Sequence, residues 1–431
     1  MSNKPFKKVV IYFIDRGKIY YNSANFDLAL ECFKKVIEIE PELEWGHFYA
    51  GQALYKLSRL DEAIEYFLKA IDLDSSCSDF YKWLGNCYKR KDEYEKALFN
   101  YKKVLQSSPK DHWIYYEVGD MFQLQEKYDQ ALINFKKAIM IKPDFPLCYN
   151  EIGNTYFYMG DFENAVKYLE KATGLNSKNA AFYYRLGRSY FQLKNFDLAE
   201  KNFRNALIFD KENISPYGYL ASIAIQKRDI PRAIKYYQDV LKINPNMPST
   251  YLQLINLASR TQKYETAIYY TFKFLERYPD DPNNAALYKN VGLICFETEK
   301  YDSSIEYFNK ALELEPNDAG VILTQGFVYL AKQDNENAFE CFNKVLKINP
   351  AEPNLNLGLS CYYVNTGDFA RATDYLRKAF KSNCEKSGFY YYLGYYFLKR
   401  EKTAAYTRYF EKALFINPLI RRAIEKLVQL P

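Results

Sequence analysis

The chain has 431 residues, and its 59 lysine and arginine residues against 53 aspartate and glutamate residues give a net charge of +6. So small an excess over so long a chain does not indicate a nucleic-acid binder, and only two histidines exclude a histidine-rich metal centre. The eight cysteines form no C-x-x-C pair, which favours free buried thiols in a reducing compartment over disulfides or a metal site.

Residues 1–9 are predicted to be a short extension ahead of the first repeated element. Basic residues precede the apolar run 9–14, but this run is too short for the core of a signal peptide and no small-residue cleavage site follows it. No other stretch is long and apolar enough to cross a bilayer. We therefore expect no membrane span and a cytoplasmic protein.

A pair of amphipathic helices is clearest in residues 112–145. Apolar residues recur at helical spacing over 113–125 and 128–141, a short polar turn separates the two runs, and Pro143 closes the second. Gly119 in the first helix and Ala131 and Ala138 in the second are small enough to let the two helices approach closely. The stretch predicts a helical hairpin.

The small residues of this hairpin recur every 34 residues. One series is Gly85, Gly119, Gly153 and Gly187, and another consists of eight alanines of the same period from Ala29 to Ala267. After Ala267 the register slips by three residues, and prolines and asparagines around 279–284 indicate a non-helical turn. The period predicts eight hairpins in 10–281, an inserted turn at 282–284, four hairpins in 285–420 and a C-terminal capping helix in 419–431.

This pattern resembles the tetratricopeptide repeat (TPR), whose signature is L-G-x2-Y, then A-x3-F, then proline. Residues 83–88, W-L-G-N-C-Y, carry the first part, and Ala131, Phe135 and Pro143 carry the rest. The resemblance covers about residues 10–418. It implies an all-α fold, a right-handed superhelical α-solenoid of about twelve hairpins, in which each unit packs on its neighbours and the first helices line a concave groove.

The resemblance also implies which residues contact a ligand, since in this family they come from five positions of each first helix. Carried over to this chain, the predicted peptide-binding groove contains basic and amide residues between aromatic ones: Lys56, Lys82, Asn86, Lys89, Arg90, Trp113, Tyr116, Asn150, Asn154, Tyr184 and Arg188. Such a surface suits an extended peptide that carries carboxylates. The alternative is that these are merely solvated polar residues.

Lys82 and Asn86 resemble the start of the clamp with which chaperone-binding members of the family hold a terminal carboxylate. The other positions of that clamp hold Glu117, Leu147 and Glu151 here. Two added carboxylates would repel the carboxylate of the ligand, so we reject a chaperone-tail receptor of the usual kind.

From the ninth hairpin onward the groove positions become apolar. They include Leu293, Phe296, Leu323, Phe327 and Leu330. A contiguous apolar wall on an exposed face is unusual in a monomer, and it could receive an amphipathic helix from a partner or from a second copy of the chain. Alternatively, tighter coiling after the register slip buries these side chains against one another.

No motif for phosphate binding, nucleophilic catalysis or metal hydrolysis is present. We therefore expect a non-catalytic scaffold or adaptor without a cofactor or metal, which binds protein or peptide partners and no nucleic acid. A second interpretation is an accessory subunit of an enzyme or of a secretion or assembly complex, docked through the apolar C-terminal lobe. A weaker third is an RNA-binding helical repeat, against which the mixed charge argues.

Overall fold

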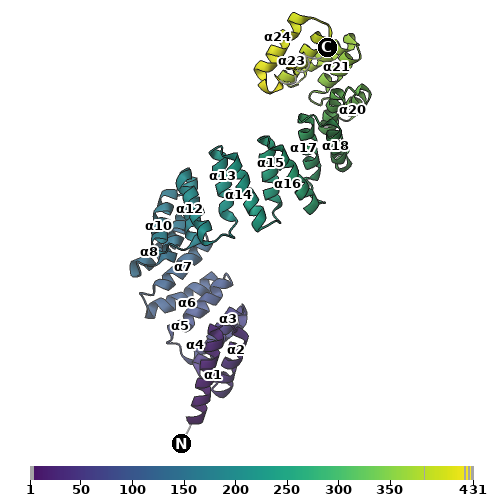
Figure 1. Cartoon of the computed structure of the whole chain (residues 1–431). Helices are drawn as coiled ribbons and strands as arrows, with labels where there is room; N and C mark the ends of the chain where they lie inside the picture. Colours follow the sequence, from purple (N-terminus) through teal and green to yellow (C-terminus); the bar gives the residue numbers. More distant parts are fainter. Residues whose placement is uncertain (1–3, 383, 422–423, 426–427, 429–431) are drawn as a thin grey trace. The chain divides into compact units, whose positions relative to one another are not determined.

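The structure, a computed structural model, describes residues 4–382, 384–421, 424, 425 and 428. These residues form 24 α-helices and one short 3₁₀ helix, and no strand occurs among them (Figure 1). By their internal contacts they divide into two compact units, 1–228 and 229–431. The division lies between α13 and α14.

The helices of the first unit are α1 (Lys4–Asn22), α2 (Phe26–Ile39), α3 (Glu44–Lys56), α4 (Leu60–Leu73), α5 (Ser78–Arg90), α6 (Tyr94–Ser107), α7 (His112–Leu124), α8 (Tyr128–Ile141), α9 (Pro146–Tyr158), α10 (Phe162–Leu175), α11 (Ala180–Gln192), α12 (Phe196–Phe209) and α13 (Ser215–Gln226). Those of the second are α14 (Ile230–Ile243), α15 (Pro248–Arg260), α16 (Tyr264–Arg277), α17 (Asn284–Glu297), α18 (Tyr301–Leu314), α19 (Ala319–Ala331), α20 (Asn335–Ile348), α21 (Leu355–Asn365), α22 (Phe369–Lys381), α23 (Lys386–Lys399) and α24 (Thr403–Ile416).

The small residues let the two helices of a hairpin touch, as the sequence predicts. A Cβ atom added to Gly119 on α7 would lie 2.6 Å from the ring of Phe135 on α8. The same distance is 2.7 Å between Gly292 and Phe308. Because real Cβ atoms do not approach a ring so closely, only glycine leaves room for the aromatic ring of the second helix. The predicted all-α array of helical hairpins is therefore confirmed.

Each first helix ends in a left-handed residue, a feature that the sequence did not reveal. Twelve such residues have φ between 55° and 80° and keep the period of 34 with its slip of three: Ala24, Ser58, Asp92, Glu126, Gly160, Lys194, Arg228, Gln262, Glu299, Gln333, Gly367 and Glu401. The next amide closes the helix, as when Lys127 donates to the carbonyl of Phe122 at 2.9 Å. Only two of the twelve are glycines, so the residue types at these positions do not indicate the repeated left-handed turn.

Two boundaries differ from those predicted. Helix α1 begins at Lys4, inside the expected extension 1–9, and α17 begins at Asn284, inside the expected turn 282–284. The Asn284 side-chain amide donates to the carbonyls of Tyr278 and Pro279 at 2.9 and 2.7 Å, which fastens this turn. The capping helix predicted at 419–431 lies partly outside the described residues, and within them Ile424 is buried in a cluster with Phe410.

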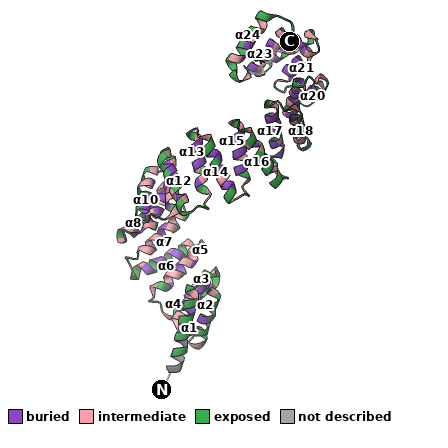
Figure 2. Cartoon of the chain, in the orientation of Figure 1, coloured by how far each residue is buried: buried purple, intermediate pink, exposed green. Residues whose placement is uncertain are grey.

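The hydrophobic core consists of a series of local clusters. One cluster joins the first three hairpins from Ala29 to Cys87, and another joins α7, α8 and α9 around Phe135. Figure 2 shows buried residues distributed along the whole array in this way. Because each hairpin buries its apolar side on its neighbours, a local change is expected to act mainly on the adjoining hairpins.

The eight cysteines are free thiols, and six of them are buried. Cys148 on α9 donates its thiol proton to the carbonyl of Phe135 at 3.2 Å. Burial raises the pKa of Cys361 and Cys87 to about 12, so both stay protonated at neutral pH. These thiols pack as small apolar side chains.

Candidate functional site

The predicted groove residues come mainly from four successive first helices of the first unit, α5, α7, α9 and α11. Helix α9 contacts both α7 and α11, so side chains at equivalent repeat positions meet across the helix boundaries. The contacts among them form a polar ladder, which we define as Lys89, Glu117, Asp120, Gln123, Asn150, Glu151, Thr155 and Arg185.

Lys89 of α5 is held by two carboxylates of α7. Its Nζ lies 2.7 Å from an oxygen of Glu117 and 2.5 Å from one of Asp120, and its side chain is only 17% exposed. Burial alone would lower the pKa of Lys89, but the two negative charges outweigh it and the pKa is raised. The predicted groove cation is therefore neutralised within the chain.

The other members of the predicted basic cluster also have partners inside the protein. The Arg90 guanidinium donates to the carbonyl of Tyr55 at 3.0 Å and to Ser58 at 3.1 Å. Asn86 accepts a hydrogen bond from the hydroxyl of Tyr101 at 2.8 Å, and Lys82 lies 3.8 Å from Asp111. The side chains of this cluster are thus bound to other residues of the hairpins and do not form an unpaired positive patch. Lys56, in contrast, is exposed.

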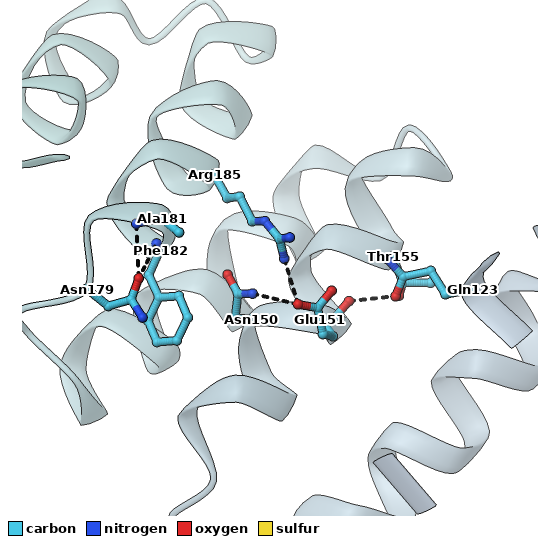
Figure 3. Close-up of polar contacts among 8 residues, drawn as sticks. All are labelled: Gln123, Asn150, Glu151, Thr155, Asn179, Ala181, Phe182 and Arg185. Carbon is cyan, nitrogen blue, oxygen red and sulfur yellow. Dashed lines mark hydrogen bonds and ion pairs between the residues drawn. The ribbon is translucent and has the colours of Figure 1, made fainter. Parts of the chain in front are cut away.

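The middle of the ladder joins α7, α9 and α11 (Figure 3). Arg185 lies 2.9 Å from Glu151, and the amide nitrogen of Asn150 donates to the same carboxylate oxygen at 2.9 Å. Thr155 Oγ1 lies 3.0 Å from the side-chain oxygen of Gln123. A lysine on α5 and an arginine on α11 thus flank the carboxylate and amide groups of α7 and α9.

Two buried polar atoms next to these contacts stay unsatisfied. Asn150 is only 3% exposed, yet its Oδ1 accepts no hydrogen bond from the described residues, and Arg188 Nε donates none to them. A buried polar atom without a partner costs free energy, so it calls for an explanation. The Arg188 guanidinium lies 4.4 Å from the ring centre of Phe157 and 5.8 Å from that of Tyr184, which fixes it between aromatic faces.

The remaining predicted residues are largely structural. Trp113 and Tyr116 pack around Phe145, with ring centroids 5.5 and 5.3 Å from it. Burial and the nearby carboxylates raise the pKa of Tyr116, and Asn154 is buried. Sequence reasoning left Arg185 out of the site. The sequence does contain an indication of its role, because Glu151, of opposite charge, stands at the same position of the preceding repeat.

The side chains of the apolar wall predicted in the second unit pack largely against other residues of that unit. Leu323 and Leu330 are buried, and Leu293, Phe296 and Phe327 are half-buried. Phe327 of α19 stacks on Tyr392 of α23 at 5.9 Å, across α21. The interpretation as an exposed wall is therefore wrong for Leu323 and Leu330, because the first helices of these hairpins approach one another closely enough to bury them.

The described residues also bear on two other kinds of feature, a membrane span and a metal site. No helix among them combines the length and the apolar character needed to cross a membrane. Within the same residues, no three histidine, cysteine, aspartate or glutamate side chains gather as metal ligands would.

Family models described as tetratricopeptide repeat or TPR repeat match most of the chain. The matched residues are 14–76, 48–112, 119–160, 150–213, 215–247, 285–318, 319–352 and 353–383. No curated protein matches the sequence.

Several solved structures are also similar to the chain. PilF of Pseudomonas aeruginosa is 17% identical, with a TM-score of 0.43, over 49% of this chain and 95% of PilF. The C-terminal part of a TPR repeat-containing protein from Cytophaga hutchinsonii is 17% identical, with a TM-score of 0.46, over 55% of this chain and 97% of that one. MamA is 27% identical, with a TM-score of 0.35, over 38% of this chain and 95% of MamA.

Proposed function

The chain belongs to the tetratricopeptide repeat family, and on that premise we propose that it is a non-catalytic scaffold that holds a segment of a partner protein against the polar ladder. Arrays of stacked repeats offer extended binding surfaces that are rigid before the ligand arrives. A preformed surface loses little conformational entropy on binding, so most of the ordering cost falls on the partner segment.

One observation carries the proposal: the unsatisfied acceptor Asn150 Oδ1 on α9 and the unsatisfied donor Arg188 Nε on α11. An extended peptide offers backbone N–H and C=O groups in alternation, and these would satisfy both atoms once the side chains that cover them move aside. The aromatic rings of Phe157 and Tyr184 beside Arg188 supply apolar contact area for its side chains.

The charges within the ladder define the kind of segment. Lys89 and Arg185 supply two positive charges against three carboxylates, Glu117, Asp120 and Glu151. A strongly acidic peptide would meet these carboxylates, so backbone hydrogen bonds rather than charge attraction provide the affinity. We propose a mixed or uncharged segment, which narrows the sequence-based expectation of an acidic partner.

The eight free thiols support a reducing compartment as the place where this scaffold works. We propose the cytoplasm on that basis. The alternative of docking through an apolar C-terminal wall loses its main support, since Leu323 and Leu330 are buried.

A peptide-display selection on the purified full-length protein tests the proposal. We expect extended peptides to be enriched, and their affinity, measured by fluorescence anisotropy, to fall about three- to tenfold in Asn150→Ala, as the loss of one hydrogen bond predicts. Arg188→Met should weaken binding similarly.

The matched control is Asn134→Ala on the second helix α8, where the amide only bonds to its own helix through the carbonyl of Gln130. It should leave the affinity unchanged. Selected peptides that bind Asn150→Ala and Arg188→Met as tightly as the parent protein would overturn the proposed site.

A further inference from the structure

The third hairpin contains an apolar hollow away from the polar ladder. Its volume is about 450 Å³, and it lies between the second helices α4 and α6 over the first helix α5. Leu68 and Ile71 of α4 form one edge and Phe99 of α6 the other, while Tyr81 and Tyr88 of α5 line it from below. Leu68 and Phe99 are 47% and 61% exposed, so the hollow opens to solvent.

Several other hairpins fill the corresponding place with a tyrosine of their own, whereas the fourth and sixth carry Asn134 and Asn202 there. In the fifth hairpin Tyr168 of α10 lies between two rings of α9, 6.4 Å from Tyr149 and 5.5 Å from Tyr156. Both pairs are nearly parallel, with interplanar angles of 28° and 21°. Tyr149 and Tyr156 occupy the repeat positions that Tyr81 and Tyr88 occupy in the third hairpin.

The same arrangement recurs in the second unit. Tyr409 of α24 stacks on Tyr390 at 6.4 Å and on Phe397 at 5.4 Å, with interplanar angles of 12° and 11°. In the preceding hairpin Tyr375 stacks on Tyr363 at 5.5 Å and 10°. An aromatic ring of the second helix on one or two aromatic rings of the first is thus a recurrent element of this chain.

In the third hairpin this position is Asn100, and its side chain does not reach into the hollow. The amide is 4% exposed and donates to the carbonyl of Lys96 on its own helix at 2.7 Å. Tyr81 and Tyr88 therefore correspond to the two rings that flank a tyrosine of the second helix in the fifth hairpin, but no such tyrosine lies between them. The hollow is a slot shaped for one aromatic side chain.

We propose that this slot, formed by Tyr81, Tyr88 and the space beside Asn100, receives a tyrosine or phenylalanine side chain of a partner protein that carries a neighbouring carboxylate. The aromatic part of the occupant follows from the three hairpins in which the chain places its own tyrosine in the same setting. Parallel stacking and burial of the ring provide the binding free energy.

The acidic part of the occupant follows from charge. Helix α6 carries three lysines and one glutamate, and α4 carries four acidic residues and one lysine. Lys103 lies 5.8 Å from the ring centre of Phe99, and Lys96 lies 5.2 Å from that of Tyr88 while it also pairs with Glu93. A carboxylate next to the partner's ring is therefore drawn to the α6 edge and repelled from α4, which orients the bound segment.

The test uses three acetylated tripeptide amides, EYE, EAE and KYK, titrated into the full-length protein and followed by saturation-transfer NMR. EYE is expected to bind, EAE to bind at least about tenfold more weakly because it lacks the ring, and KYK about threefold more weakly because of its charge. Equal affinity for EYE and EAE would overturn the proposal.

The decisive variant is Asn100→Tyr, which supplies the missing ring from the chain itself. It should raise the midpoint of thermal unfolding and lower the affinity for EYE at least about tenfold. The control Leu346→Ala changes an exposed side chain of the second unit and should leave the affinity for EYE unchanged. Unaltered binding of EYE to a folded Asn100→Tyr protein would contradict the proposal.

A second readout covers the case in which Asn100→Tyr does not fold. Tyr88→Leu keeps the slot apolar but removes one stacking face, and it should weaken EYE binding about threefold or more. Sedimentation velocity then tests whether the slot is occupied by a second copy of this chain instead of a separate partner. A dimer of the parent protein that dissociates in either variant would assign the slot to self-association and overturn the choice of a separate partner.

Discussion

Phe327 on α19 stacks on Tyr392 on α23, with ring centroids 5.9 Å apart, although α21 and its whole hairpin lie between them in the chain. Elsewhere the repeats touch mainly their immediate neighbours. Here a first helix reaches past the next hairpin to the one after. The contact reflects the close approach of these first helices, which buries Leu323 and Leu330 although the sequence assigns them to an open groove.

The contact predicts coupling between separated hairpins. Phe327→Ala should destabilise the second unit by about 2 kcal/mol, less than a fully buried phenylalanine would, because the ring is half-buried. Hydrogen exchange should accelerate in both α19 and α23. The control Leu346→Ala on α20 removes an exposed side chain and should change neither helix. Faster exchange confined to α19 and α20 would show that the stack does not hold α23.

Gly119 tests the close approach of the two helices in a hairpin. Gly119→Ala should destabilise the protein by about 1–3 kcal/mol, because the new Cβ would lie 2.6 Å from the ring of Phe135 and force it to move. In contrast, Gly218→Ala on α13 meets no atom within 4 Å and should stabilise the helix slightly. Thermal unfolding followed by circular dichroism distinguishes the two. Equal effects would refute the packing argument.

Glu126 tests the repeated left-handed turn. This residue has φ of 59°, which costs a residue with a side chain more than it costs glycine. Glu126→Gly is therefore expected to stabilise the protein by about 0.5–1 kcal/mol, after the larger entropy of glycine in the unfolded chain is counted. The neighbouring Gln125 has φ of −85°, so Gln125→Gly should destabilise by a similar amount. Chemical denaturation of both variants provides the comparison, and a loss of stability in Glu126→Gly would contradict it.

The raised pKa of Lys89 predicts that its contribution to the stability of the fold depends on pH. Its pKa in the folded protein is raised above the ordinary 10.5, so its stabilising contribution is complete below that value and disappears as pH rises through the folded pKa. Lys89→Met leaves Glu117 and Asp120 facing each other and should cost about 2 kcal/mol at pH 7. The difference between parent and variant should stay constant from pH 7 to about pH 10 and shrink above it.

The control for this prediction is Lys35→Met, which removes an exposed pair with Glu38 and should have no measurable effect. The midpoint of thermal unfolding, compared between each variant and the parent protein at each pH, gives the result. A gap for Lys89→Met that widens with rising pH would have the wrong sign for this account.

The sequence predicted the hairpins well because their signals are local and repeated. Gly119 and Phe135 belong to one hairpin, and the period of 34 places each such pair without knowledge of the rest of the chain. The bounds of α8, Tyr128–Ile141, agree with the amphipathic pattern for the same reason. The left-handed turn was not predicted, because a glutamate at position 126 does not indicate a positive φ.

The candidate site was harder to predict because it depends on how neighbouring hairpins are rotated. Lys89 and Asp120 belong to different hairpins, and nothing in either helical pattern shows that their side chains meet. The same holds for the slot at Asn100, which is visible only when its contacts are compared with those of Tyr168. Residue positions carried over from the family lie on the helices of the proposed site, but they do not reveal the internal ion pairs that neutralise their charged side chains.

Hydrogen exchange of the full-length protein with a display-selected peptide bound is the most direct test of the proposed scaffold. The account predicts that the peptide slows exchange in the first helices α9 and α11, which carry Asn150 and Arg188, and leaves the second helices α8 and α10 unchanged. Protection that falls on α8 and α10 while α9 and α11 exchange as in the free protein would contradict it.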